Sequence, residues 1–207
     1  MSDFTYETAD IKTPLETYEW DNTWIEQAND HSTPRVLYIG NSISCGTRRL
    51  CTSVSNKTLL FDGFGTSKSI DNPYFFKSIQ LFAEQEGRRD AIIFNSGLHG
   101  WHIEDKDEYR FYYEKMIRFL LENFKDVPLF LALSTTVKNE ERERRVLIRN
   151  SVVKALAEEY NLSVIDLYSV SLENIELRSE DGVHFEKEGY RKLAERIVAD
   201  IKEKIYK

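Results

Sequence analysis

Short apolar runs alternate with longer amphipathic segments from residue 35 to the end of the chain. The runs are rich in Val, Ile, Leu and Phe and have the length of buried strands; they lie at residues 35–39, 58–61, 91–95, 129–133 and 163–167. Strands that alternate with helices in this way form βαβ units, whose connections place helices on both faces of the sheet. The pattern therefore predicts an α/β fold with a parallel sheet.

Four further segments carry apolar residues at three- and four-residue spacing. They lie at residues 72–86, 107–123, 140–160 and 187–205. In the last of them Leu193, Ile197 and Ile201 fall on one stripe. We expect these helices to pack on the sheet, and the last one to complete a single domain over residues 34–207.

The first 33 residues lack a clean period for either a helix or a strand. Tyr18, Trp20 and Trp24 are interleaved there with polar and acidic residues. We expect an N-terminal arm, residues 1–33, that packs on the domain. Two interpretations stay open: an aromatic strap that only covers the core, or an arm whose Trp20 and Trp24 line a substrate cleft together with Trp101.

The composition narrows the class of protein. With 207 residues, 41% of them apolar, the chain can fill one sizeable core. It carries 28 Lys and Arg against 35 Asp and Glu, and the formal charge of -7 would repel a phosphate backbone, so we expect no nucleic-acid partner. The N-terminus lacks a signal-peptide pattern, and no apolar run is long enough to span a bilayer. These features favour a cytoplasmic protein, with a mature secreted form as the alternative, and leave the oligomeric state open.

Two polar clusters at opposite ends of the domain have the residue types of a nucleophilic site. Ser42 directly follows the first apolar run, and the ligands of such sheets bind at the carboxyl ends of the strands. A serine hydroxyl needs a base within hydrogen-bond reach and a third group that orients the base. Asp181 and His184, three residues apart just before the last helix, offer this pair. Each residue alone is typical of a helix cap or a loop, but together they indicate a Ser-His-Asp triad.

The same residues resemble the SGNH/GDSL hydrolases, and the resemblance extends from residue 35 to the C-terminus. The first block of that family is Gly-Asp-Ser and the last is Asp-x-x-His. In this chain the two blocks read Gly40-Asn41-Ser42 and Asp181-Gly182-Val183-His184, the latter followed by Phe185 and by Glu188-Gly189-Tyr190. The resemblance implies a flavodoxin-like three-layer α/β/α sandwich with a five-stranded parallel sheet. It also implies a carboxylic ester hydrolase that needs no metal or other cofactor.

The resemblance further implies an oxyanion hole. Its donors would be the N–H of Ser42, a glycine N–H after the second strand and a side chain after the third. In this chain Gly65 is our choice for the glycine, with Gly63 as the alternative. His99 stands where the family has Asn, as in a subgroup with Gly-Leu-His in this block, and Asn95 is a second candidate.

Other interpretations rest on fewer features. An α/β-hydrolase would need Gly-x-Ser-x-Gly around the nucleophile, which the chain lacks. His99 and His102, with Glu104 and Asp105 close behind, would be the start of a metal site, but no further Cys or His pair completes a ligand set. A noncatalytic carbohydrate- or acyl-binding module is the alternative from another class, because Asn41 and His99 depart from the family pattern. For an enzyme, the preferred substrate is a small-molecule or carbohydrate ester with a short acyl group such as acetyl, because tryptophans stack well on sugar rings.

Overall fold

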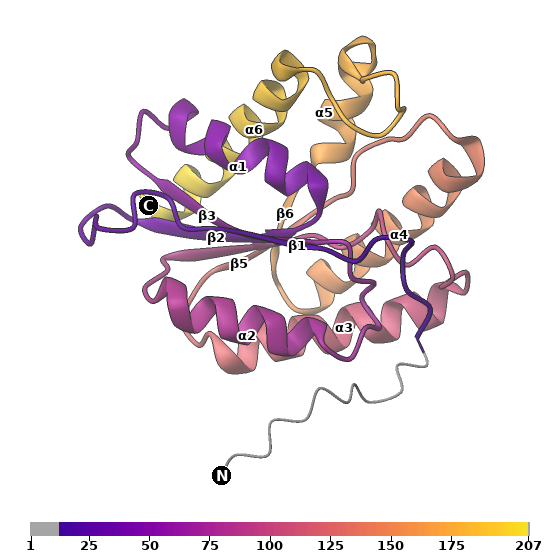
Figure 1. Ribbon diagram of the computed structural model, residues 1–207, viewed down its shortest axis with the longest axis horizontal. Helices are drawn as coiled ribbons and strands as arrows, with labels where there is room; N and C mark the ends of the chain where they lie inside the picture. Colours follow the sequence, from indigo (N-terminus) through magenta and orange to yellow (C-terminus); the bar gives the residue numbers. More distant parts are fainter. Residues whose placement is uncertain (1–12, 207) are drawn as a thin grey trace.

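The computed structural model describes residues 13–206, which form one six-stranded sheet with helices on both faces (Figure 1). The strands are β1 (Asp21–Trp24), β2 (Arg35–Gly40), β3 (Leu60–Thr66), β4 (Ala91–Phe94), β5 (Leu129–Ala132) and β6 (Ser163–Ile165). Their order across the sheet is β1-β3-β2-β4-β5-β6. Strands β2 to β6 pair in parallel, whereas β1 pairs antiparallel with β3 at one edge.

Two hydrophobic clusters fill the space between the sheet and its helices. The helices are α1 (Ser42–Val54), α2 (Phe75–Glu86), α3 (Lys106–Asn123), α4 (Glu140–Glu159), α5 (Leu167–Glu173) and α6 (Lys187–Ile205), and a 3-10 helix follows α5 at Ile175–Leu177. Side chains alternate along each strand: Leu37 and Ile39 pack with α2 and α3, while Val36 and Tyr38 pack with α1 and α6. Figure 1 shows α1, α5 and α6 over one face of the sheet and α2 and α3 over the other. The predicted three-layer α/β/α fold is confirmed, with β1 as a strand beyond the predicted five.

Several elements end at other residues than the sequence pattern predicts. Strand β3 runs to Thr66 because it pairs with β2 on one side and with β1 on the other, which stabilises a stretch that contains two glycines. The run predicted as a strand at residues 163–167 ends at Ile165, because Asp166 caps α5 by accepting the Ser169 N–H. No described helix combines the length and apolar character needed to cross a membrane.

A buried ion pair fastens the arm to the sheet. Arg35 and Asp62 pair at 2.7 Å, and the Asp62 side chain is fully buried. Asp62 also accepts the N–H of Glu26 at 2.7 Å, while the Arg35 guanidinium donates to the carbonyl oxygens of Glu26 and Asp30. These bonds hold the segment after β1 against β2 and β3. The first 12 residues of the predicted arm lie outside the described residues, and the domain boundary at residue 34 stays a prediction.

Candidate active site

Ser42 is the first residue of α1, directly after the carboxyl end of β2. Asn41 caps the helix, because its side-chain oxygen accepts the N–H of Ile43 at 3.0 Å. Ser42 is half-buried at this edge of the sheet. Gly40 is required by close packing, since a Cβ there would lie 2.8 Å from the Ser44 side chain. The strand-to-helix junction thus presents the Ser42 hydroxyl and its N–H, which has no partner within the helix.

Asp181 and His184 are held in a tight turn before α6. One carboxylate oxygen of Asp181 accepts the N–H groups of Val183 and His184, both at 2.9 Å. Gly182 in this turn has a φ of 76°, which favours glycine. The bond from the Val183 N–H, the contact with the His184 ring and the His184 N–H hold the pKa of Asp181 well below its usual value. Asp181 is therefore an ionised carboxylate at neutral pH.

The structure brings the three predicted triad residues together in a line of hydrogen bonds. The second carboxylate oxygen of Asp181 lies 2.6 Å from Nδ1 of His184, and Nε2 of the same ring lies 2.8 Å from the Ser42 hydroxyl oxygen. Because an ionised carboxylate can only accept, Nδ1 carries the proton, and Nε2 of the neutral ring can accept the hydroxyl proton of Ser42. This arrangement can make a serine hydroxyl nucleophilic.

Asn41 and Asn95 share a buried hydrogen bond that joins the first and third loops. The Asn41 amide donates to Oδ1 of Asn95 at 3.0 Å, and the Asn95 amide donates to the Ala132 carbonyl oxygen at 2.7 Å and to the Ser134 hydroxyl at 3.2 Å. The amide hydrogens of Asn95 are thus engaged, so donation to an oxyanion would require breaking buried bonds. The Ala132 carbonyl also turns the Asn95 oxygen toward residue 41, where the Asn41 amide can donate to it and a carboxylate could not.

Gly65 lies beside the nucleophile loop, but its N–H faces the edge strand. A Cβ on Gly65 would lie 3.4 Å from the Asn41 carbonyl oxygen. N–H groups alternate in direction along a strand, and the N–H of Ser67, two residues further on, donates to the Trp20 carbonyl oxygen on the β1 side. The N–H groups of Gly65 and of its alternative Gly63 face the same side. Donation to an oxyanion stays a prediction for both glycines.

His99 lies in the loop after β4 and contacts the N-terminal arm. Its Nδ1 is 3.3 Å from the Glu16 carboxylate, and the Trp20 ring meets the imidazole edge-on at 6.1 Å between centroids. Burial lowers the pKa of His99, an effect that the charge of Glu16 opposes, so the ring is neutral at pH 7. With Nδ1–H directed at Glu16, Nε2 of a neutral ring is an acceptor. The predicted oxyanion donation from this nitrogen would need a second proton on the ring. The contact between Glu16 and His99 could not be predicted from a local sequence pattern, because the two residues are 83 positions apart in the chain.

The three tryptophans occupy two different places. Trp20 lies just beyond the end of β3, and Trp101 is half-buried in the loop after β4, so both belong to the edge of the sheet that carries Ser42. Trp24 pairs with Gly63, three residues before the end of β3, and its ring lies 4.8 Å from the guanidinium of Arg49. Only Trp20 and Trp101 are thus placed near the loops of the triad, and substrate binding stays a prediction for all three.

The two histidines of the alternative metal site contact different carboxylates. His102 pairs with Asp71 at 2.9 Å, and His99 faces Glu16. Across residues 13–206 there is no group of three or more His, Cys, Asp or Glu side chains that could hold a metal ion.

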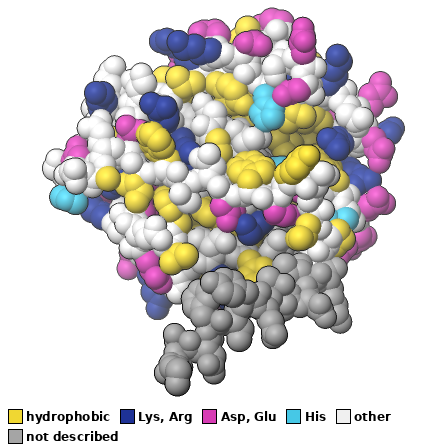
Figure 2. All heavy atoms as spheres, viewed as in Figure 1, with side chains coloured by type: hydrophobic (Ala, Val, Ile, Leu, Met, Phe, Trp, Pro, Cys, Tyr) yellow, Lys and Arg dark blue, Asp and Glu magenta, His cyan; other side chains and the backbone are white. Residues whose placement is uncertain are grey.

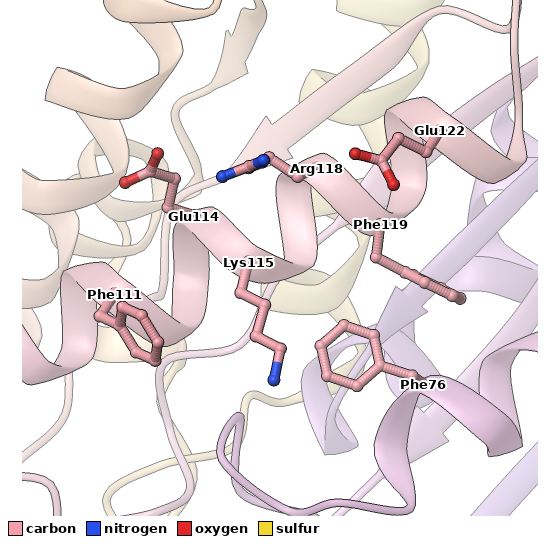
Figure 3. A pocket seen from close by; sticks show the side chains of 7 residues that line it. All are labelled: Phe76, Phe111, Glu114, Lys115, Arg118, Phe119 and Glu122. Atoms are coloured by element: carbon pink, nitrogen blue, oxygen red, sulfur yellow. The ribbon is translucent and has the colours of Figure 1, made fainter.

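Several hollows mark the surface of the described residues. A small cavity of about 170 Å³ lies between the arm and the loops after β3 and β4; it is lined by Pro14, Leu15, Glu16, Ser69, Gly100, Trp101 and His102. A groove of about 520 Å³ lies between α2 and α3, where Phe76, Phe111 and Phe119 surround Lys115 (Figure 3). The groove contains none of the predicted site residues. Figure 2 shows apolar side chains at several places on one face, including its centre, with acidic and basic side chains directly below the central ones and around the outline.

Comparisons with known proteins give the fold. The sequence matches no protein-family model and no curated protein. A lipolytic protein of the G-D-S-L family from Veillonella parvula is 19% identical, with a TM-score of 0.65 over 81% of this chain and 97% of that chain. A lipase/acylhydrolase from Enterococcus faecalis is 18% identical, with a TM-score of 0.66 over 83% and 96% of the two chains. An acetyl xylan esterase from Geobacillus stearothermophilus is 18% identical, with a TM-score of 0.61 over 82% and 95%.

These likenesses extend over almost the whole length of the other chains. At this level of identity, what the chain and its structural neighbours share is the architecture. The protein therefore has the SGNH/GDSL hydrolase fold.

Proposed function

We propose that the protein is a serine carboxylic ester hydrolase with Ser42 as its nucleophile. The observation that carries the proposal is the line of hydrogen bonds from Asp181 through His184 to Ser42 at the carboxyl edge of the sheet. The fold supports it, because the similar solved structures are described as lipolytic proteins, acylhydrolases and acetyl xylan esterases.

In the proposed reaction every proton passes through the His184 ring. His184 Nε2 takes the hydroxyl proton as the Ser42 oxygen bonds to the ester carbonyl carbon, and Asp181 stabilises the imidazolium that forms. The imidazolium then returns the proton to the departing alcohol oxygen, which leaves an acyl group on Ser42. Water attacks this acyl-enzyme while His184 takes one of its protons; the imidazolium then returns that proton to the Ser42 oxygen as the carboxylic acid leaves.

The oxyanion of each tetrahedral intermediate would be held at the start of α1. The N–H of Ser42 is the first of the helix and is adjacent to the oxygen that attacks, and helix N-termini favour negative charge. Gly65 and His99 were expected as further donors, but the Gly65 N–H faces β1, and Nε2 of His99 could donate only with a second proton on the ring. Because an oxyanion donor acts on the reacting carbonyl itself, loss of one should lower kcat on every ester alike.

A short acyl group on a carbohydrate is the substrate that we propose. Two similar solved structures are described as acetyl xylan esterases. Trp20 and Trp101 lie in loops at the carboxyl edge, where an aromatic ring can stack on a sugar.

The experiment that tests the proposal is labelling with a serine-directed fluorophosphonate, followed by intact-mass measurement. We expect one adduct on the wild-type chain, none on Ser42→Ala, and hydrolysis of p-nitrophenyl acetate that the same substitution abolishes. Ser44→Ala is the matched control, because Ser44 lies in the same turn of α1 and donates its hydroxyl to the Asn41 carbonyl oxygen. An unlabelled chain that turns over no ester but binds carbohydrate or acyl ligands would establish the noncatalytic module instead.

A further inference from the structure

The N-terminal arm supplies a carboxylate to the loop after β4. One oxygen of Glu16 lies 3.3 Å from Nδ1 of His99 and accepts the backbone N–H of Gly100 at the same distance. The N–H of Glu16 donates to Glu19, which fixes the arm locally. Gly100 has a φ of 66° and a Cβ there would collide with Ser69, so this turn requires glycine. The carboxylate is thus held by two neighbouring groups of the loop after β4, the His99 ring and the Gly100 N–H.

The contact with Glu16 decides which ring nitrogen of His99 carries the proton. A carboxylate accepts hydrogen bonds, so Nδ1 is the protonated nitrogen, and Nε2 of the neutral ring presents a lone pair. Three charged groups act on the ring: Glu16 and Glu19 raise the pKa of His99, whereas Arg149, which donates to the His99 carbonyl oxygen, lowers it. Among residues 13–206 Nε2 has no hydrogen-bond partner, and 21% of the side chain is exposed. An acceptor therefore remains open to a ligand.

We propose that Glu16 is a positioning residue that holds His99 in its Nδ1–H form, and that Nε2 of His99 accepts a hydroxyl group from the alcohol part of the substrate. The inference rests on the proposed esterase function and adds a requirement on the alcohol part of the substrate: a polyol, such as a carbohydrate, in which a free hydroxyl lies next to the short-chain ester. A site with an acceptor of this kind selects against an analogue that lacks the hydroxyl, because the lone pair is then left unpaired.

The substrate half of the inference is tested by a pair of esters. We expect the wild-type enzyme to have a higher kcat/KM for glycerol monoacetate than for propyl acetate, which has the same acyl group without the hydroxyls. His99→Ala should reduce the ratio of the two kcat/KM values about tenfold, which corresponds to the free energy of one hydrogen bond. An oxyanion donor would instead lower kcat for both esters by the same factor. An unchanged ratio in His99→Ala would overturn the substrate half.

The positioning half is tested without turnover, by ¹⁵N NMR of the His99 ring in the whole protein at pH 7. We expect a neutral ring with the proton on Nδ1 in the wild-type chain. Glu16→Gln keeps an acceptor and should keep this form, whereas Glu16→Ala should let Nε2–H become populated and lower the ester ratio as His99→Ala does. A wild-type ring protonated on Nε2, or one that Glu16→Ala leaves unaltered, would overturn it. If Ser42 is not labelled and no ester is cleaved, the esterase function fails, and the spectra still decide the role of Glu16.

Discussion

At the scale of single residues, the identity of residue 41 depends on its buried partner. Asn41→Asp would keep the helix cap, because a carboxylate can still accept the Ile43 N–H, but it would face the Asn95 oxygen without a hydrogen to donate. We expect a loss of about 1–3 kcal/mol in the free energy of unfolding, measured by urea denaturation, together with a lower kcat/KM. Asn41→Ala, which removes both bonds, is the comparison. If Asn41→Asp is as stable as the wild type, the Asn95 amide can exchange the positions of its oxygen and nitrogen at little cost in free energy.

The orientation of His184 gives a second prediction at this scale. Asp181→Asn can present its amide nitrogen to the ring and so favour the tautomer with Nε2 protonated, which cannot accept the Ser42 proton. We expect kcat to fall roughly 10²–10⁴-fold with little change in thermal stability. Ser179→Ala is the matched control, since it removes only a side-chain bond to the same carboxylate. Equal kcat values for Asp181→Asn and the wild type would show that Asp181 has no role in the reaction.

The proximity of Ser42, Asp181 and His184 could be predicted from the sequence because each of them lies next to an element boundary. Ser42 follows an apolar run, and Asp181 and His184 share a local turn of four residues, so short patterns contain most of their geometry. His99 was a candidate from its block, but its partner Glu16 was not, because no local pattern links positions 83 apart. The directions of the Gly65 N–H and of the Asn95 amide likewise depend on neighbouring strands.

At the scale of elements, the Arg35–Asp62 pair links β2, β3 and the arm. Arg35→Met would leave the Asp62 carboxylate buried without its cation, and we expect a loss of about 3–5 kcal/mol in the free energy of unfolding. Asp62→Asn, which retains an acceptor for the Glu26 N–H, should cost less. The measurement is guanidinium denaturation of the three proteins. A small effect of Arg35→Met would show that water reaches Asp62 and replaces the guanidinium.

Elements with a strong apolar period are the ones that the sequence predicted well. Helix α6 has the predicted ends, and β2, β4 and β5 differ from their predicted ends by one residue. Strand β1 was not predicted, because its four residues are exposed and mostly polar, and they form a strand only by pairing with the edge of β3. An edge strand of this kind forms because it pairs with a neighbouring strand, and its sequence shows no alternation of apolar and polar residues.

At the scale of the whole molecule, the fold buries an acid that does not belong to the proposed triad. The Glu86 side chain at the end of α2 is fully buried and pairs with Arg89 at 2.8 Å. Burial raises the pKa of Glu86 to about 8; Arg89 opposes this shift and the nearby Asp62 adds to it. The folded state therefore holds a proton on Glu86 across a pH range in which the unfolded chain has lost it.

This difference sets a pH dependence of stability that can be separated from the other titrating groups. Between about pH 4.5 and pH 8 the folded state binds the Glu86 proton more tightly than the unfolded state does, so the contribution of Glu86 to the free energy of unfolding decreases as the pH rises. Glu86→Gln is neutral at every pH. We therefore expect its stability relative to the wild type to increase steadily from pH 5 to pH 8, measured by urea denaturation in both proteins. Parallel curves for the two proteins would mean that Arg89 keeps Glu86 ionised in the folded state, and that the core of this molecule accommodates the charge.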